Sequence, residues 1–142
     1  MAFDGSIRAL FKYLGYPFSE QKAINGKPDF VLPSESHFRE NPTDCIIFTV
    51  KRTLRERWRQ IVTEGSRGLL FFLATLDDSQ RPSALRQMQD ERIYLVVLEG
   101  MKESIPPYTT ALNVISYEDF FEDYLDPAVE RWKRSGTLEE EN

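Results

Sequence analysis

Hydrophobic and polar residues recur along the chain with two different periods, and each period predicts one kind of element. Apolar side chains return every three or four positions in residues 6–14, which is typical of an amphipathic helix. Residues 18–24 carry a weaker pattern that indicates an edge strand, and the Asn25-Gly26 pair after them is typical of a hairpin turn. Residues 30–32 form an apolar run that predicts a second short strand.

An alternation of period two is clearest in residues 45–51, which predicts a strand with two distinct faces. One face is expected to carry Ile46, Phe48 and Val50, and the other Ile47, Thr49 and Lys51. The preceding residues 34–44 are polar and predict a loop or a single helical turn. After Lys51 the period lengthens to that of a helix, whose buried stripe comprises Leu54, Trp58, Ile61 and Val62.

The second half of the chain alternates between strands and helices. Buried strands are predicted at residues 69–75 and 93–98, helices at 82–90 and 116–132, and a loop at 104–110. Ser116 is the expected cap of the last helix, and Pro127 is expected to break it. The order of helix, two or three strands, helix, strand, helix, strand and helix predicts an α/β domain with a mixed sheet of about four to five strands.

Length and composition favour one globular domain. The chain has 142 residues, 41% hydrophobic and 29% charged, and we assign the domain to residues 1–136 and an acidic disordered tail to residues 137–142. The longest apolar run, residues 69–74, is far too short to span a membrane, and no export leader is visible. The one cysteine, Cys45, excludes an internal disulfide and is expected to be a buried thiol. These features predict a cytoplasmic protein with no membrane partner.

The charge is distributed unevenly along the chain. The formal net charge is −5, yet residues 51–67 carry six basic and two acidic side chains, a local excess of four positive charges. Acidic residues gather instead at positions 118–126 and in the tail. Such a distribution presents one basic face to phosphates while the molecule as a whole stays acidic. The alternative is a solvated helix face rich in arginine, and charge alone does not decide between the two.

Three side chains are expected to approach one edge of the sheet. Asp29 opens one strand and Lys51 closes the next, so antiparallel pairing brings both to the same edge, and Glu64 borders the buried stripe of the following helix. Two carboxylates there can share a hard cation such as Mg²⁺, which polarises a phosphate and acidifies a bound water. Lys51 can orient that water or neutralise charge in the transition state. The competing interpretation is an ordinary turn aspartate, a strand-end lysine and a solvated glutamate.

The start of the following helix also has two interpretations. Arg55, Glu56 and Arg57 suit adjacent G·C pairs in a major groove, since arginine pairs with guanine O6 and N7 and a carboxylate accepts from cytosine N4. Thr53 with Glu56 also matches a capping box, in which Glu56 folds back to the helix start. Both interpretations use Glu56, and they stay open at this point.

The run from Lys51 to Gln60, with Pro28-Asp29 upstream and Glu64 downstream, resembles the active-site block of the EcoRII-like type II restriction endonucleases, in the PD-(D/E)xK nuclease superfamily. In that group the second acid has moved from the strand to the following helix, and here Thr49 stands at the usual acid position while Glu64 takes the relocated one. The resemblance takes in most of residues 3–122. It implies a restriction-endonuclease-like core.

Carried over position by position, the resemblance implies an Mg²⁺-dependent deoxyribonuclease that acts on double-stranded DNA as a homodimer. Asp29 and Glu64 would be metal ligands, Lys51 the catalytic lysine, and Arg55, Glu56 and Arg57 the residues that read C·G pairs in a site of the CC…GG type. Asp4 matches an accessory acid more weakly.

The chain departs from the pattern of the group at Arg52, where relatives usually carry a small hydroxyl residue. Only 28 residues precede Asp29, so the relatives' N-terminal segments that help dimerisation or read the central base are expected to be missing.

Two other classes of function stay open beside the nuclease. One is a non-catalytic module that binds DNA or a protein partner through the basic helix, and the other is a monomeric nicking or repair nuclease. A hydrolase triad has little support, because His37 is the only histidine and is expected to be solvated in a polar loop. The aromatic residues Phe120, Phe121, Tyr124 and Trp132 recur at helical spacing and are expected in the core rather than against bases.

Overall fold

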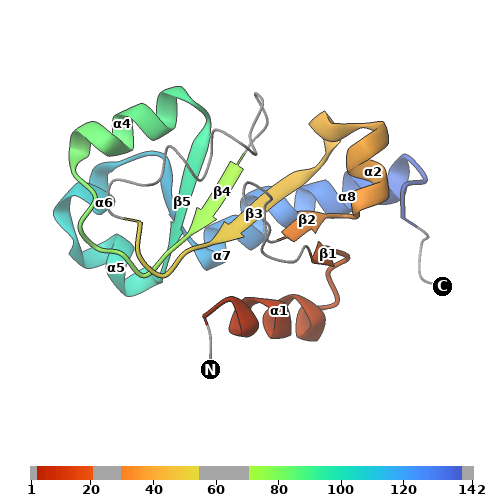
Figure 1. Ribbon diagram of the computed structural model, residues 1–142, viewed down its shortest axis with the longest axis horizontal. Coiled ribbons are helices and arrows are strands. Elements are labelled where there is room, and N and C mark those ends of the chain that lie inside the picture. The colour runs from red at the N-terminus through yellow and green to blue at the C-terminus, as the bar shows by residue number, and fades with distance from the viewer. Residues whose placement is uncertain (1–2, 21–29, 55–70, 139–142) are drawn as a thin grey trace.

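The computed structural model, which describes residues 3–20, 30–54 and 71–138, is built around one mixed sheet (Figure 1). Its six strands lie in the order in which they occur along the chain. They are β1 (Ser19–Glu20), β2 (Phe30–Leu32), β3 (Ile46–Val50), β4 (Phe71–Ala74), β5 (Ile93–Val97) and β6 (Val114–Ser116). β1, β2 and β3 pair antiparallel, whereas β3 to β6 pair parallel. The predicted α/β mixed sheet is therefore confirmed, with more strands than expected.

Helices cover both faces of the sheet, as two separate apolar clusters show. The helical elements of the described residues are α1 (Phe3–Leu14), α2 (Glu35–Glu40), a 3-10 turn (Pro42–Asp44), α4 (Pro82–Asp90), α5 (Glu99–Ser104), α6 (Pro106–Thr110), α7 (Tyr117–Asp119), a π-helical segment (Phe120–Leu125) and α8 (Asp126–Arg134). One face packs against α4, α5 and α6, and the other packs against α1, the π-helical segment and α8.

The two faces predicted for residues 45–51 are confirmed. Ile47 belongs to the cluster beneath α4 and α6, while Ile46, Phe48 and Val50 belong to the cluster beneath α1 and α8. All five residues of β3 are buried because helices cover both sides of the sheet. Four consecutive buried residues in β4 have the same cause, which is why this strand appears in the sequence as an unbroken apolar run.

Two features of the second half of the chain differ from expectation. Residues 104–110 are not a loop, since Pro106 opens the short helix α6, where a proline loses no intrahelical hydrogen bond. The break expected near Pro127 takes the form of a change of helix type, since a π-helical segment ends at Leu125 and α8 begins at Asp126, with Pro127 in its first turn. Residues 114–116 form the edge strand β6, and the expected helix begins after it, with Ser116 accepting a hydrogen bond from the Asp119 amide as predicted.

In the part of the chain that the structure describes, no helix is both long enough and apolar enough to cross a membrane.

Candidate active site

The start of β2 and the end of β3 lie at the same edge of the sheet, meaning the edge that is formed by strand ends and not by an outer strand. Phe30, the first residue of β2, pairs with Phe48, and β3 then continues in the opposite direction to Val50 and Lys51. The Lys51 amide donates a hydrogen bond to the Ala74 carbonyl at 2.9 Å, so the pairing of β3 with β4 extends to the lysine itself. The backbone of Lys51 is thus fixed at the carboxyl end of two parallel strands.

The Lys51 side chain is exposed to solvent, as is that of Arg52. Among the described residues, the Lys51 ammonium has no carboxylate within ion-pair distance. A solvent-exposed ammonium carries little free-energy penalty. A phosphate that approaches this edge therefore meets a positive charge on a rigid strand end. The local geometry therefore agrees with the role that the sequence predicts for Lys51.

Thr49 marks the polar side of β3 next to the lysine. Its side chain is 3% exposed, and Oγ1 finds no hydrogen-bond partner among the described residues. A buried hydroxyl without a partner is unfavourable, so this position favours an additional polar group nearby.

The turn between β4 and α4 holds the segment that follows Lys51. The Leu54 amide donates to Asp77 Oδ2 at 2.8 Å, and Thr75 Oγ1 donates to the Arg52 carbonyl at 3.2 Å. Leu54 itself is fully buried, as the predicted helical stripe requires of its first member. The backbone between Lys51 and Leu54 is therefore attached to the turn that follows β4 at both an N–H and a C=O group.

That turn is itself rigidly held. Asp77 Oδ1 accepts hydrogen bonds from the amide of Ser79 at 2.8 Å and from its hydroxyl at 2.5 Å. Tyr108, fully buried in α6, donates from its hydroxyl to the Asp77 carbonyl at 2.7 Å and accepts from the Gln80 amide at 3.1 Å. Burial raises the pKa of Tyr108 to about 12, so the hydroxyl keeps its proton and remains a donor at neutral pH.

Asp77 and Tyr108 were not predicted as site residues. The Asp77-Asp78-Ser79 run does carry the pattern of a side chain that bonds to its own turn, which predicts the bond to Ser79. No local pattern predicts the bond to Leu54, because that partner lies 23 residues away in the sequence.

The remaining predicted site residues lie outside the described part of the chain. These are Asp29, Arg55, Glu56, Arg57 and Glu64. Asp4 lies in α1. Within the described ranges no group of three or more His, Cys, Asp or Glu side chains is arranged to hold a metal ion, and neither predicted carboxylate ligand falls in those ranges.

The described residues are nevertheless compatible with a divalent cation at this edge. Asp29 directly precedes Phe30, whose place opposite Phe48 is fixed by strand pairing. The buried hydroxyl of Thr49 without a partner favours a polar group at the same edge, and the exposed Lys51 ammonium favours an anionic one. Carboxylate oxygens from Asp29 and Glu64 are the ligands that Mg²⁺ prefers.

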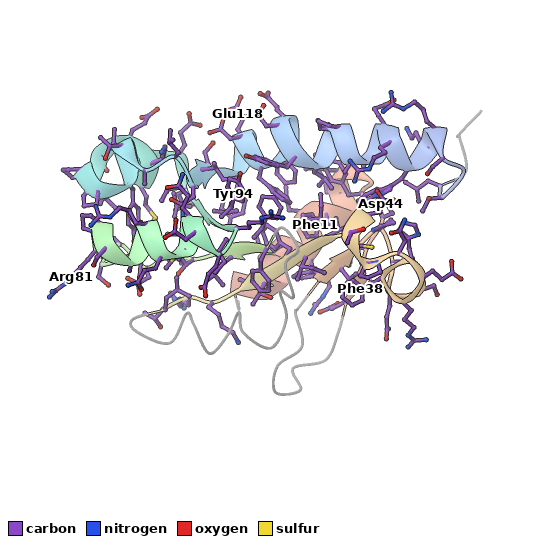
Figure 2. All side chains as sticks on the ribbon, turned by 90° about the horizontal axis from the view of Figure 1, so that it is seen from above. Phe11, Phe38, Asp44, Arg81, Tyr94 and Glu118 are labelled. Carbon is purple, nitrogen blue, oxygen red and sulfur yellow. The ribbon has the colours of Figure 1, made fainter. Side chains whose placement is uncertain are left out.

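The opposite end of β3 is closed by a cluster of charged side chains around Asp44. Its Oδ2 lies 2.8 Å from His37 Nε2, its Oδ1 accepts from Arg131 Nε at 2.6 Å, and its carbonyl accepts from Trp132 Nε1 at 2.8 Å. Figure 2 shows Asp44 beside α8, with Arg81 at the far end of the molecule. The expectation that His37 is merely solvated is wrong, because its side chain is only 15% exposed and is bonded to Asp44.

Comparison with known proteins agrees with this geometry. The family described as EcoRII C terminal matches residues 1–121. The type II restriction enzyme SsoII of Shigella sonnei is 25% identical over 115 residues, which are 80% of this chain and 37% of that enzyme. The type II restriction enzyme EcoRII of Escherichia coli is 33% identical over 85 residues, which are 58% of this chain and 21% of that enzyme.

Two solved structures share the fold. Metal-depleted Ecl18kI in complex with uncleaved DNA superposes with a TM-score of 0.75 and 28% identity, covering 96% of this chain and 46% of that one. The PspGI restriction endonuclease in complex with substrate DNA gives a TM-score of 0.69 and 21% identity, covering 87% of this chain and 59% of that one. The chain thus spans between 21% and 59% of the length of these relatives. The match over residues 1–121 confirms the resemblance found in the sequence, and the chain belongs to the EcoRII C-terminal family, related to type II restriction endonucleases.

Proposed function

We propose that this chain is an Mg²⁺-dependent DNA endonuclease of restriction type, which hydrolyses phosphodiester bonds in double-stranded DNA at a site containing CC and GG. Family membership supports the class of reaction, since the matched relatives are type II restriction enzymes. Similarity to Ecl18kI, solved with uncleaved DNA, supports DNA as the substrate.

The observation that carries the proposal is the position of Lys51. It stands exposed at the carboxyl end of β3, at the edge where β2 begins immediately after Asp29. A strand end held on both sides by pairing limits the movement of the lysine backbone, so its ammonium is presented from a fixed point. A catalytic group gains most from such fixed placement, because orientation lowers the entropic part of the barrier.

In the proposed mechanism Asp29 and Glu64 hold the cation and Lys51 acts on the phosphate. When bound, Mg²⁺ would polarise the scissile phosphate and lower the pKa of a water that attacks it. The Lys51 ammonium neutralises negative charge that develops on the phosphate oxygens in the transition state. The exposed, unpaired state of this ammonium among the described residues suits that task, since no carboxylate must first be displaced.

Arg55, Glu56 and Arg57 are proposed to read the bases. They follow Leu54, whose amide and side chain are both fixed in the fold. Arginine contacts to guanine O6 and N7 and a glutamate contact to cytosine N4 would select C·G pairs. Cutting both strands of a symmetric site requires two catalytic centres, so we propose that the active form is a homodimer.

Incubation of the full chain with supercoiled plasmid tests the proposal. With Mg²⁺ we expect linear product whose ends map to CC/GG-containing positions, and with EDTA no product. Nicked circles without linear DNA would indicate a monomeric nicking nuclease in place of the proposed dimeric enzyme. Binding to DNA with no cleavage at any Mg²⁺ concentration would instead identify a non-catalytic binding module.

A further inference from the structure

We propose that Asp77 is a positioning residue for sequence recognition, which acts by holding the backbone from which Arg55, Glu56 and Arg57 continue. This inference rests on the proposed function. Asp77 lies on the turn between β4 and α4, far in sequence from the residues that it would control, and it would not itself touch DNA.

The bond from the Leu54 amide to Asp77 Oδ2 is the core of the argument. At 2.8 Å it is a short, charge-assisted hydrogen bond, and such bonds are about twice as strong as neutral ones. Leu54 is the last described residue before Arg55. Because the peptide unit is planar, the bond to the Leu54 N–H restrains the plane of the Thr53–Leu54 peptide, which directly precedes the bond to Arg55.

A second bond restrains the same segment two residues earlier. The Arg52 carbonyl accepts from Thr75 Oγ1 at 3.2 Å, and the same hydroxyl oxygen accepts from the Asp77 amide at 3.0 Å. Attachment at two backbone atoms restrains both the position and the direction of the chain. A single attachment would leave the segment free to pivot, and an error of about 1 Å in the placement of a contact costs much of its value.

The carboxylate is committed to this task. Asp77 is 6% exposed, Oδ2 accepts from Leu54, and Oδ1 accepts from both the amide and the hydroxyl of Ser79. Both side-chain positions, Oδ1 and Oδ2, must therefore be hydrogen-bond acceptors, and only a carboxylate provides two acceptor oxygens. The buried hydroxyl of Tyr108, in α6, donates a hydrogen bond to the backbone carbonyl of Asp77 and thereby fixes the base of the turn.

Asp77→Asn is the decisive variant. Its amide keeps one acceptor, which the neighbouring Ser79 satisfies, and turns an NH₂ donor toward the Leu54 N–H, where two donors oppose each other. Tyr108→Phe is the second variant, since it removes the two bonds to the turn and leaves the ring in the core. Asp44→Asn is the matched control, because it makes the same chemical change in a held aspartate at the other end of β3.

Discrimination is measured as the ratio of cleavage rates on two duplexes. One carries the site mapped for the wild-type chain, and the other has a single G·C pair of that site replaced by A·T. Thermal unfolding is recorded for every variant, and exchange of the Leu54 amide hydrogen is followed by NMR.

We expect Asp77→Asn to lower this ratio by about tenfold or more, the lower part of the range for one base contact. Tyr108→Phe should lower it less, and Asp44→Asn should lower the unfolding temperature while leaving the ratio as in the wild type. The Leu54 amide should exchange fastest in Asp77→Asn, less fast in Tyr108→Phe, and at the wild-type rate in Asp44→Asn. Rescue of the ratio by Asp77→Glu would further support a carboxylate requirement.

An unchanged ratio in a folded Asp77→Asn chain would overturn the inference, as would an equal fall in Asp44→Asn. If Asp77→Asn does not fold, an unchanged ratio in Tyr108→Phe overturns it. Failure of the proposed function is recognised separately, because the wild-type chain would then cut neither duplex before any residue is changed.

Discussion

The two ends of strand β3 differ in how their charged side chains are paired. At its start, Asp44 is bonded to His37 and to Arg131, and the indole of Trp132 donates to its carbonyl. At its end, the Lys51 ammonium is exposed and has no ion-pair partner among the described residues. Charges that are paired hold elements together, whereas a charge left unpaired on a rigid support is available to a substrate.

The two aspartates beside these ends show the same difference. Asp44 accepts from side chains of α2 and of α8, and α8 is distant from it in sequence. Asp77 accepts from the amides of Leu54 and Ser79, so it sets the course of the backbone next to the proposed site. Substitutions at the first end should therefore change stability, and substitutions at the second should change activity, with each end serving as the control for the other.

The largest expected effect is that of Lys51→Ala. Loss of the ammonium removes charge stabilisation from the transition state, and we expect plasmid cleavage to fall roughly 10³-fold, as for removal of one well-placed donor. The unfolding temperature should stay unchanged, because the side chain is exposed. Lys133→Ala on α8 is the control and should cut at the wild-type rate. Wild-type cleavage by Lys51→Ala would remove this end of β3 from the mechanism.

Next in size is the effect of Arg57→Ala on sequence discrimination. We expect the preference for the mapped site over a site with one altered G·C pair to fall by roughly 1–3 kcal/mol, the value of one bidentate contact. The measurement is the ratio of cleavage rates on the two duplexes. Arg134→Ala, an exposed arginine in the last turn of α8, should leave the ratio as it is. An unchanged ratio in Arg57→Ala would exclude Arg57 from the reading set.

At the start of β3, Trp132→Phe should reduce the free energy of unfolding by about 1–2 kcal/mol, through loss of the bond to the Asp44 carbonyl and of buried volume. Trp132 is fully buried, and its Nε1 lies 2.8 Å from that carbonyl. Urea denaturation measures the change. Cleavage by the folded variant should be normal, and a large loss of cleavage without loss of stability would contradict the division between the two ends.

The smallest expected effect is the acid sensitivity contributed by Asp44. Burial acts to raise the pKa of Asp44, but hydrogen bonds from His37 and Arg131 outweigh it and hold the pKa below its ordinary value of 3.8. A carboxyl whose pKa is lower in the folded than in the unfolded chain stabilises the fold at pH values above its pKa in the unfolded chain. That contribution is lost as the pH falls through the unfolded value toward the folded one.

We therefore expect the unfolding temperature of the wild type to exceed that of Asp44→Asn near neutral pH. The gap should narrow below about pH 4, where the unfolded carboxyl is protonated. Thermal scans from pH 7 to pH 3 measure it. A gap that stays constant over this range would show that the ionised carboxylate contributes nothing.

Most of the fold could be predicted from the sequence because burial leaves a local signature. The apolar run in β4 and the alternation in β3 each fix a strand and its faces. β6 was missed because three residues are too few for a period to appear. α6 was missed because a proline pair resembles a loop, although proline at the first position of a helix removes no bond.

The candidate site could be predicted only in part. The place of Lys51 at the end of a strand was predicted correctly from the local period, and its catalytic role stays a prediction. Asp77 and Tyr108 act through contacts with partners more than twenty residues away, and no spacing in the sequence marks such contacts. His37 was misjudged for the same reason, since the elements that cover it meet only in the folded chain.

A double-mutant comparison of plasmid cleavage in Mg²⁺ tests most directly whether the start of β2 and the end of β3 form one catalytic unit. The rates of the wild type, Asp29→Asn, Lys51→Ala and the double variant are measured under identical conditions. Residues that act as one unit are strongly non-additive, so each single variant should lose nearly all cleavage and the double variant should be no slower than the slower single one. Retained Mg²⁺-dependent cutting in either single variant would contradict the account.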